Sequence, residues 1–118
     1  MLFELSDRAR MIQEQLERFM DEQVYPNERA YHEQVEASGD PHFEPPIMKE
    51  LRAKAKGLGL WNLFLPDPEH GPGLSNLEYT PLCEIMGRSG IAPRVFNCQA
   101  PDTGNAEILA EFGTPEQK

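Results

Sequence analysis

Apolar residues recur at three- and four-residue steps near the start of the chain, and charged residues fall between them. The apolar positions are Leu5, Ala9, Ile12, Leu16, Phe19 and Met20. This spacing predicts an amphipathic helix that is capped near Ser6 and runs to about Val24. Because a residue before proline is pushed out of helical geometry, we expect a break or kink at Tyr25-Pro26. A second helical piece, from Asn27 to about Ala37, should follow.

A loop at residues 38–45 precedes a second apolar stripe. Pro46 suits the first position of a helix. The stripe behind it consists of Ile47, Met48, Leu51, Ala55 and Leu58. Gly57 or Gly59 can end this helix in the left-handed conformation that glycine adopts readily. The apolar run from Leu60 to Pro66 is then expected to be extended chain laid over the core.

The next helix has two possible starting points. Ser75 and Glu78 have the spacing of a capping box, so that Pro81 would bend the helix from within. Alternatively, Thr80 is the cap and Pro81 occupies the first helical position. In both cases the buried face consists of Leu82, Ile85 and Met86.

A last helix is expected to open at Pro101 and to end at Gly113. Its apolar residues Ile108, Leu109 and Phe112 should face inward. The sequence contains no alternating strand pattern. We therefore predict an all-α chain, an up-and-down type helical bundle of four to five helices, with residues 1–118 forming one domain.

The final residues carry a helix start signal. Thr114 can act as N-cap, Pro115 fits the first helical position, and Gln117 has the spacing of the second half of a capping box. A start signal without a helix behind it leads us to expect that the chain is the leading domain of a longer protein.

Charge and composition narrow the function classes. Twenty acidic against eleven basic residues give a formal charge of −9, which would repel nucleic-acid phosphates and anionic membrane surfaces. Two cysteines are too few for a disulfide framework or a zinc site, and the three histidines lack metal-site spacing. We therefore expect no nucleic acid, membrane or metal among the ligands. The absence of a targeting or spanning segment favours an intracellular chain.

One glycine pair could suggest a dinucleotide-binding loop. Gly57 and Gly59 have the right spacing, but Asn62 stands where the third glycine belongs and no strand is predicted before them. Acidic residues are abundant, and none is marked as buried. The sequence therefore identifies neither a flavin or nucleotide contact nor a catalytic base.

The most unusual composition lies at residues 96–105, which combine amides, a thiol, a hydroxyl and a helix N-terminus. Such a stretch suits the polar wall of a pocket. It also suits a connection whose Asn97, Asp102 and Asn105 satisfy nearby backbone groups, and composition alone favours this second interpretation. Gly104 destabilises a helix by about 1 kcal/mol relative to alanine, which indicates close approach of a neighbouring helix or a ligand.

Several separated segments resemble the N-terminal helical domain of the acyl-CoA dehydrogenases, and most closely the subgroup that includes the member-11-like enzymes. They are Gly59–Pro66, His70–Tyr79, Glu84–Ser89, Asn97–Asn105 and Phe112–Lys118. The likeness covers nearly the whole chain, and the segments stand in the family's order, which makes the resemblance specific.

The resemblance implies an FAD-dependent oxidoreductase that removes hydrogens from the α and β carbons of an acyl-CoA, with the α proton going to a glutamate and the β hydride to the flavin. It also implies a middle β domain and a C-terminal helical domain, which hold the glutamate and most of the flavin site and are absent from this chain. The isolated chain is accordingly expected to be inactive. The full-length protein is expected to be a dimer or tetramer.

The resemblance reverses the preference for a mere cap at residues 96–105, because the family lines its acyl pocket with this stretch. It implies wall residues Phe96, Asn97, Ala100 and Gly104, with Cys98, Gln99 and Asp102 behind them. Ala106 departs from the pattern, since close relatives carry methionine there, and its small side chain should loosen the local pocket or packing. Arg94 is a weaker candidate for a phosphate contact.

A different class of function is a stand-alone helical interaction module that kept the fold and lost the chemistry. A truncated domain of either kind would expose surface that is normally covered, so we expect the 118-residue chain to self-associate. The missing targeting peptide fits a bacterial cytoplasm, and it equally fits an organellar protein whose leader precedes this sequence.

Overall fold

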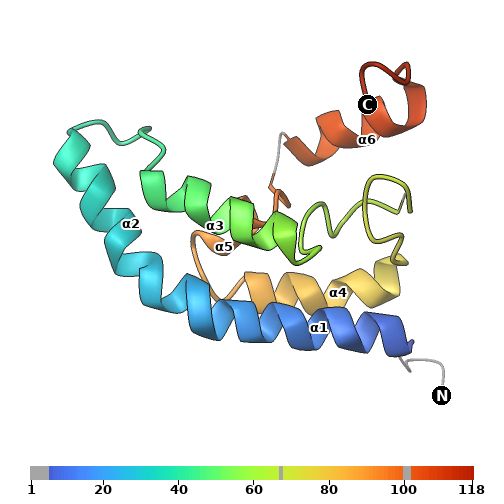
Figure 1. The fold of residues 1–118 in the computed structure, drawn as a ribbon, viewed down its shortest axis with the longest axis horizontal. Helices are drawn as coiled ribbons and strands as arrows, with labels where there is room; N and C mark the ends of the chain where they lie inside the picture. The colour runs from blue at the N-terminus through green and yellow to red at the C-terminus, as the bar shows by residue number, and fades with distance from the viewer. Residues whose placement is uncertain (1–5, 67, 100–101) are drawn as a thin grey trace.

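The computed structural model describes residues 6–66, 68–99 and 102–118 (Figure 1). Its elements are α1 (Asp7–Phe19), the π-helical segment η1 (Met20–Val24), α2 (Tyr25–Ser38), α3 (Pro46–Gly57), α4 (Asn76–Met86), the short α5 (Ala92–Val95) and α6 (Asp102–Phe112). The described residues contain no strand, and the predicted all-α bundle is confirmed. The single turn α5 was not predicted. Helix α1 packs on α4, α2 on α3, and α3 on α5.

The helical rod formed by α1, η1 and α2 changes direction without a break (Figure 1). The bend predicted at Pro26 is present, but helical geometry is kept by a π-turn in which the N–H of Tyr25 bonds to the carbonyl of Met20. The Asn27 side chain donates to the carbonyl of Gln23 at 2.6 Å. These bonds satisfy backbone groups that lie around the missing proline N–H, so the chain has no need to leave the helix.

Helix α3 begins and ends as its sequence predicts. Pro46 occupies the first helical position. At the other end Gly59 adopts φ +77°, and the N–H of Leu60 bonds to the carbonyl of Ala55 at 2.8 Å. This is a Schellman motif, in which buried Leu60 also packs back over buried Ala55.

The run after α3 is not extended, in contrast to the expectation. Asn62 adopts φ +54°, and the N–H of Leu65 bonds back to the carbonyl of Asn62 at 2.9 Å, which forms a tight turn. The turn lets Leu60, Leu63 and Leu65 all point into the core. Strict extension would have turned alternate side chains outward.

Helix α4 begins at the first of its two predicted starting points, after the cap Ser75. Ser75 and Glu78 form a complete capping box, and Pro81 lies inside the helix. Thr80 is therefore not the cap, and its hydroxyl donates to the carbonyl of Asn76 at 2.7 Å. Leu82, Ile85 and Met86 are buried as predicted.

The core lies among α1, η1, α3, α4 and α5. Its largest fully buried side chains include Phe96, Leu16, Met20, Met48, Leu51 and Leu82. The rings of Phe19 and Phe96 meet edge to face, with centroids 5.3 Å apart. The π-turn places Met20 and Val24 in this core together with Phe19.

Helix α6 stands apart from this core, at the upper right of Figure 1. The expectation that its apolar residues face inward is wrong within this chain, because Ile108, Leu109 and Phe112 are 59, 44 and 79% exposed. None of the helix's described residues is buried. The predicted start at Pro101 lies outside the described residues, whereas the capping box of Thr114 and Gln117 is present.

Candidate functional site

The candidate stretch joins the core to α6 and is anchored by a pair of asparagines. Asn97 adopts φ +56°, and its side-chain N–H donates to the side-chain oxygen of Asn62 at 2.7 Å. The backbone N–H of Asn62 bonds to the carbonyl of Phe96 at 3.1 Å, and its side chain donates to the carbonyl of His70 at 3.3 Å. Asn62 therefore ties three separate segments together.

Gly71 completes this junction. A Cβ atom at Gly71 would lie 2.8 Å from the carbonyl oxygen of Leu65 and 2.9 Å from that of Asn62. Only glycine fits there without a backbone shift. Residues from three of the segments that carry the family resemblance thus meet at one place, around Asn62, Gly71 and Asn97.

The role of Asn62 was missed from the sequence, which singled it out only as the residue that spoils a glycine motif. One signal was available, because asparagine is enriched among residues that adopt positive φ. Its partner lies 35 residues away. No local pattern predicts such a pairing.

Phe96 belongs to the core in this structure. It is fully buried against Phe19. Its side chain is therefore closed off from the surface by the described residues, and its contribution to a pocket wall stays a prediction.

Cys98 lies in a half-buried position beside Tyr79. Its thiol donates to the carbonyl of Phe96 at 3.4 Å. Burial raises the pKa of the Cys98 thiol, and burial also raises the pKa of Tyr79, next to the two cysteine thiols. Because the pKa of each group is raised by burial, neither Cys98 nor Tyr79 is favoured as a thiolate or phenolate, and both act here as hydrogen-bonding and packing groups.

Three other candidates lie at the surface where the chain enters α6. Gln99 and Asp102 are exposed, and the Gln99 carbonyl accepts from the N–H of Thr103 at 3.2 Å. A Cβ at Gly104 would meet nothing within 4 Å. The close approach of a neighbouring helix, expected from the sequence, is therefore not found among the described residues, and a ligand at Gly104 stays a prediction. Ala100 lies outside the described residues.

Arg94 is held by its neighbours. Its guanidinium donates to the Tyr31 hydroxyl at 2.9 Å, and its carbonyl accepts from Nε of Arg52 at 3.0 Å. Arg52 also pairs with Glu44 at 3.0 Å. These contacts brace α5 against α2 and α3, so Arg94 has a structural role in addition to any contact with an anion.

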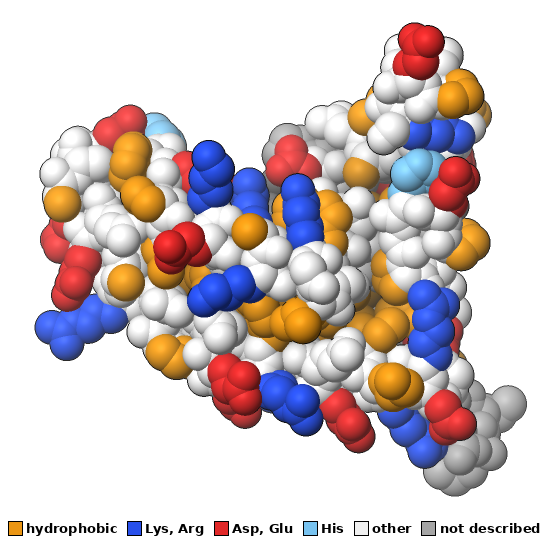
Figure 2. Space-filling view, viewed as in Figure 1, with side chains coloured by type: hydrophobic (Ala, Val, Ile, Leu, Met, Phe, Trp, Pro, Cys, Tyr) orange, Lys and Arg blue, Asp and Glu red, His pale blue; other side chains and the backbone are white. Residues whose placement is uncertain are grey.

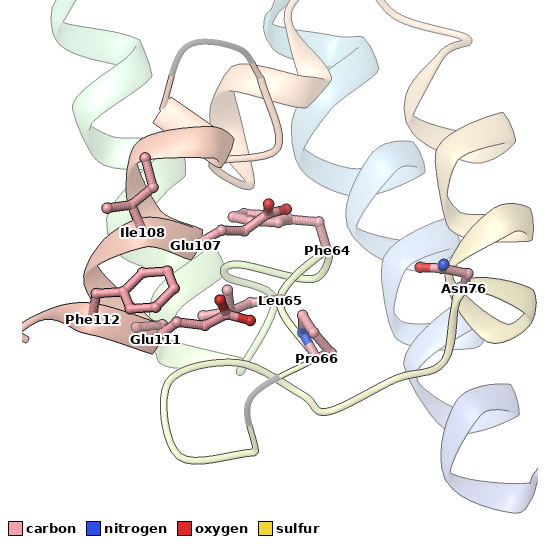
Figure 3. A pocket seen from close by; sticks show the side chains of 9 residues that line it. Phe64, Leu65, Pro66, Asn76, Glu107, Ile108, Glu111 and Phe112 are labelled. Carbon is pink, nitrogen blue, oxygen red and sulfur yellow. The ribbon is translucent and has the colours of Figure 1, made fainter.

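Two hollows flank α6. A groove of 570 Å³ runs between the helix and the turn at residues 64–66, and Figure 3 shows Glu107 and Glu111 pointing from α6 toward that turn. A smaller hollow of 120 Å³ is lined by Ala106, Asn62 and Leu65 among others. Ala106, beside which looser packing is expected from the sequence, is one of the residues that line this second hollow. Neither hollow is lined by the predicted wall residues of 96–104.

The structure agrees with the sequence in excluding a dinucleotide-binding loop at Gly57 and Gly59. The pair Gly57 and Gly59 forms the end of α3 rather than a phosphate-binding loop, since no strand precedes it. Within the same residues, no cluster of three or more metal-ligating side chains occurs, and no helix is long and apolar enough to cross a membrane.

Comparison with known proteins gives a consistent result. Residues 6–118 match the family described as acyl-CoA dehydrogenase, N-terminal domain. Over 97% of its length the chain is 50% identical to acyl-CoA dehydrogenase family member 10 of Mus musculus, of which it covers 11%. It is 48% identical, over 98% of its length, to the probable acyl-CoA dehydrogenase FadE2 of Mycobacterium tuberculosis, of which it covers 28%.

The fold agrees as well. A solved structure from Mycobacterium abscessus that is assigned to the acyl-CoA dehydrogenases superimposes with a TM-score of 0.82 at 49% sequence identity. The match covers 98% of this chain and 30% of that one. The chain thus spans less than a third of the length of each of these three relatives.

Proposed function

Because the chain belongs to the acyl-CoA dehydrogenase family, as its N-terminal helical domain, we propose that it is the substrate-side domain of an FAD-dependent enzyme that dehydrogenates acyl-CoA thioesters between the α and β carbons. In this proposal the catalytic base and most of the flavin site come from the remaining domains of the same protein, and the isolated chain is inactive.

The observation that carries the proposal is the exposure of the apolar side chains of α6. The bundle is well packed, and no buried side-chain nitrogen or oxygen among the described residues lacks a hydrogen-bond partner. Large apolar side chains are also exposed elsewhere, at Met11, Leu58 and Leu77. Helix α6 differs because three of them, Ile108, Leu109 and Phe112, lie on one helix that has no buried residue among those described. Figure 2 shows apolar side chains at the surface of this lobe. A well-packed core beside a helix with exposed apolar side chains is expected for an enzyme domain whose neighbouring domain is absent.

The acyl pocket is proposed at the N-terminal end of α6. There the Asn62–Asn97 junction fixes the backbone, and Gly104 presents a helix surface without a side chain. An acyl chain can approach such a surface closely. Phe96, Asn97 and Ala100 would form the wall together with Gly104, and Cys98, Gln99 and Asp102 would support it from behind.

Partners and setting follow from the same proposal. The substrate is an acyl-CoA, the other domains belong to the same polypeptide, and the whole enzyme forms a dimer or tetramer. A bacterial enzyme of this kind would work in the cytoplasm and a eukaryotic one in an organelle. In this proposal the CoA phosphates bind away from this domain's acidic surface, because a formal charge of −9 would repel them.

The test is to express the complete reading frame that contains this sequence and to record visible absorption before and after adding acyl-CoA. A yellow protein whose flavin bleaches supports the proposal. A control with free CoA in place of acyl-CoA separates reduction by substrate from binding of the nucleotide part. A colourless protein that ends at Lys118 would instead favour the interaction module, because the uncovered face of α6 would then be available to a partner.

A further inference from the structure

The groove beside α6 combines apolar walls with two carboxylates. Phe64, Leu65 and Pro66 line one side, and Ile108 and Phe112 contribute from α6. Glu107 and Glu111 stand one helical turn apart, and in Figure 3 Glu107 points toward Phe64 and Glu111 toward Leu65 and Pro66. The groove measures 570 Å³, which is large enough for several side chains of a partner.

The two carboxylates have no cation to balance them. Neither Glu107 nor Glu111 has a hydrogen bond or ion pair from its side chain to another described residue, and no lysine or arginine lines the groove. Like charges four residues apart on a helix repel each other and destabilise it. A positive group placed between them would remove this repulsion.

This charge pattern excludes several occupants. An aliphatic acyl chain would strip water from the two carboxylates without replacing their hydrogen bonds. The phosphates of CoA would be repelled. Symmetric pairing of two copies through this groove would bring four carboxylates together. A segment that carries both apolar side chains and a cation satisfies the walls and the carboxylates at once.

We propose that this groove docks a segment from the remaining polypeptide of the same enzyme, in which apolar side chains flank a lysine or arginine that lies between Glu107 and Glu111. The inference rests on the proposed function, because it takes the chain to be one domain of a larger enzyme. The proposal assigns a different role to each end of α6. Substrate would bind at the N-terminal end, at Gly104, and another domain would dock at the C-terminal part, Glu107–Phe112.

The first experiment identifies the occupant in the full-length protein. A carbodiimide joins a carboxylate directly to a lysine amine only when the two are in contact, and mass spectrometry of the digest locates the amide. The expected product joins Glu107 or Glu111 to a lysine outside residues 1–118. Mixing isotopically light and heavy protein shows whether the link lies within one polypeptide. A link to residues 1–118 of a second copy would overturn the proposal.

The second experiment tests the charge and also detects an arginine, which carbodiimide does not couple. The paired change Glu107→Lys and Glu111→Lys is compared with Glu14→Lys and Glu36→Lys, which alter the net charge equally at exposed positions outside the groove. Hydrogen exchange of the α6 amides should accelerate about tenfold in the groove variant alone. Equal exchange in both variants would overturn the proposal. Neither readout needs substrate turnover, so the result stands apart from the dehydrogenase assay.

Discussion

The side-chain amide of Asn97 donates to the side-chain oxygen of Asn62 at 2.7 Å, and both residues adopt positive φ. Each side chain thus holds the other's unusual backbone conformation in place. The bond connects the turn after α3 to the stretch that enters α6. The position of the proposed acyl pocket therefore depends on a contact between residues 35 positions apart.

Substitution of Asn97 should separate the hydrogen bond from the backbone strain. Asn97→Gly loses the bond and keeps the freedom to adopt positive φ, so we expect a loss of about 1 kcal/mol in the free energy of unfolding. Asn97→Ala adds strain at φ +56° and should lose about 2 kcal/mol in total. Denaturant unfolding measures both. If the Asn97→Ala variant has the same free energy of unfolding as the Asn97→Gly variant, backbone strain at position 97 is not a cause of the loss.

Gly104→Ala should distinguish a functional glycine from a structural one. The added Cβ meets nothing within 4 Å of the described chain, so the helix should gain up to about 1 kcal/mol. In the full-length enzyme the same methyl group should narrow the acyl pocket and lower kcat/KM, most for branched or bulky acyl groups. Gly57→Ala is the matched control, since Gly57 is also helical and open. Unchanged kcat/KM for Gly104→Ala would remove Gly104 from the pocket wall.

Ala106→Met should stabilise the lobe that contains α6. The hollow of 120 Å³ beside Ala106 can take the longer side chain, and filling such a space commonly adds about 0.5–2 kcal/mol. Thermal unfolding of the wild-type and substituted chains measures the gain. Ala110 also lines this hollow, so Ala110→Met tests whether any added volume on this side of α6 suffices. A destabilised Ala106→Met chain would mean that the hollow cannot accept the side chain.

Glu78 should make stability depend on pH in the acid range. The Ser6 hydroxyl donates to it at 2.6 Å, and this bond, followed by the backbone N–H of Ser75, holds the pKa of Glu78 below its usual 4.5. A depressed folded pKa gives stability that is present above the unfolded value and is lost as pH falls through the folded one. Between about pH 5 and pH 3 the wild-type chain should therefore lose stability more steeply than Glu78→Gln. The control Glu84→Gln, on the same helix, should keep the wild-type slope.

The two cysteines should differ in reactivity. Cys83 is exposed, whereas Cys98 is half-buried and its thiol pKa is raised by burial. Because the thiolate is the reactive form, Cys98 should be alkylated much more slowly than Cys83 at pH 8. Mass spectrometry of peptides after timed iodoacetamide treatment measures the two rates. In denatured protein, which serves as the control, the two cysteines should be alkylated at similar rates. Equal alkylation rates in the native protein would show that burial does not protect Cys98.

Helix boundaries were predictable where a local signal decides them. The proline at the start of α3, the left-handed Gly59 after it and the Ser75–Glu78 capping box all act within a few residues. Helix α5 was missed because one turn is too short to show a period. The turn at Asn62 was missed because it depends on distant partners.

The orientation of α6 could not be read from periodicity. Its apolar spacing predicts an apolar face, but the sequence does not say whether anything within these residues covers that face. Phe112 is 79% exposed, so the described chain leaves it uncovered, and the proposed function assigns its cover to the remaining domains. The same holds for the candidate wall residues, because the proposed function places the acyl pocket between domains, so that this chain would supply only one of its walls.

The π-turn at Met20–Val24 also sets the rotational phase of everything that follows it. Each residue of an α-helix turns the chain by about 100°, so the wider turn shifts α2 about its own axis relative to a regular continuation of α1. That phase directs Tyr31 toward Arg94 and the core. Deleting one residue from this turn would leave the composition almost unchanged. It would nevertheless point Tyr31 away from Arg94, and the hydrogen bond that joins α2 to α5 would be lost.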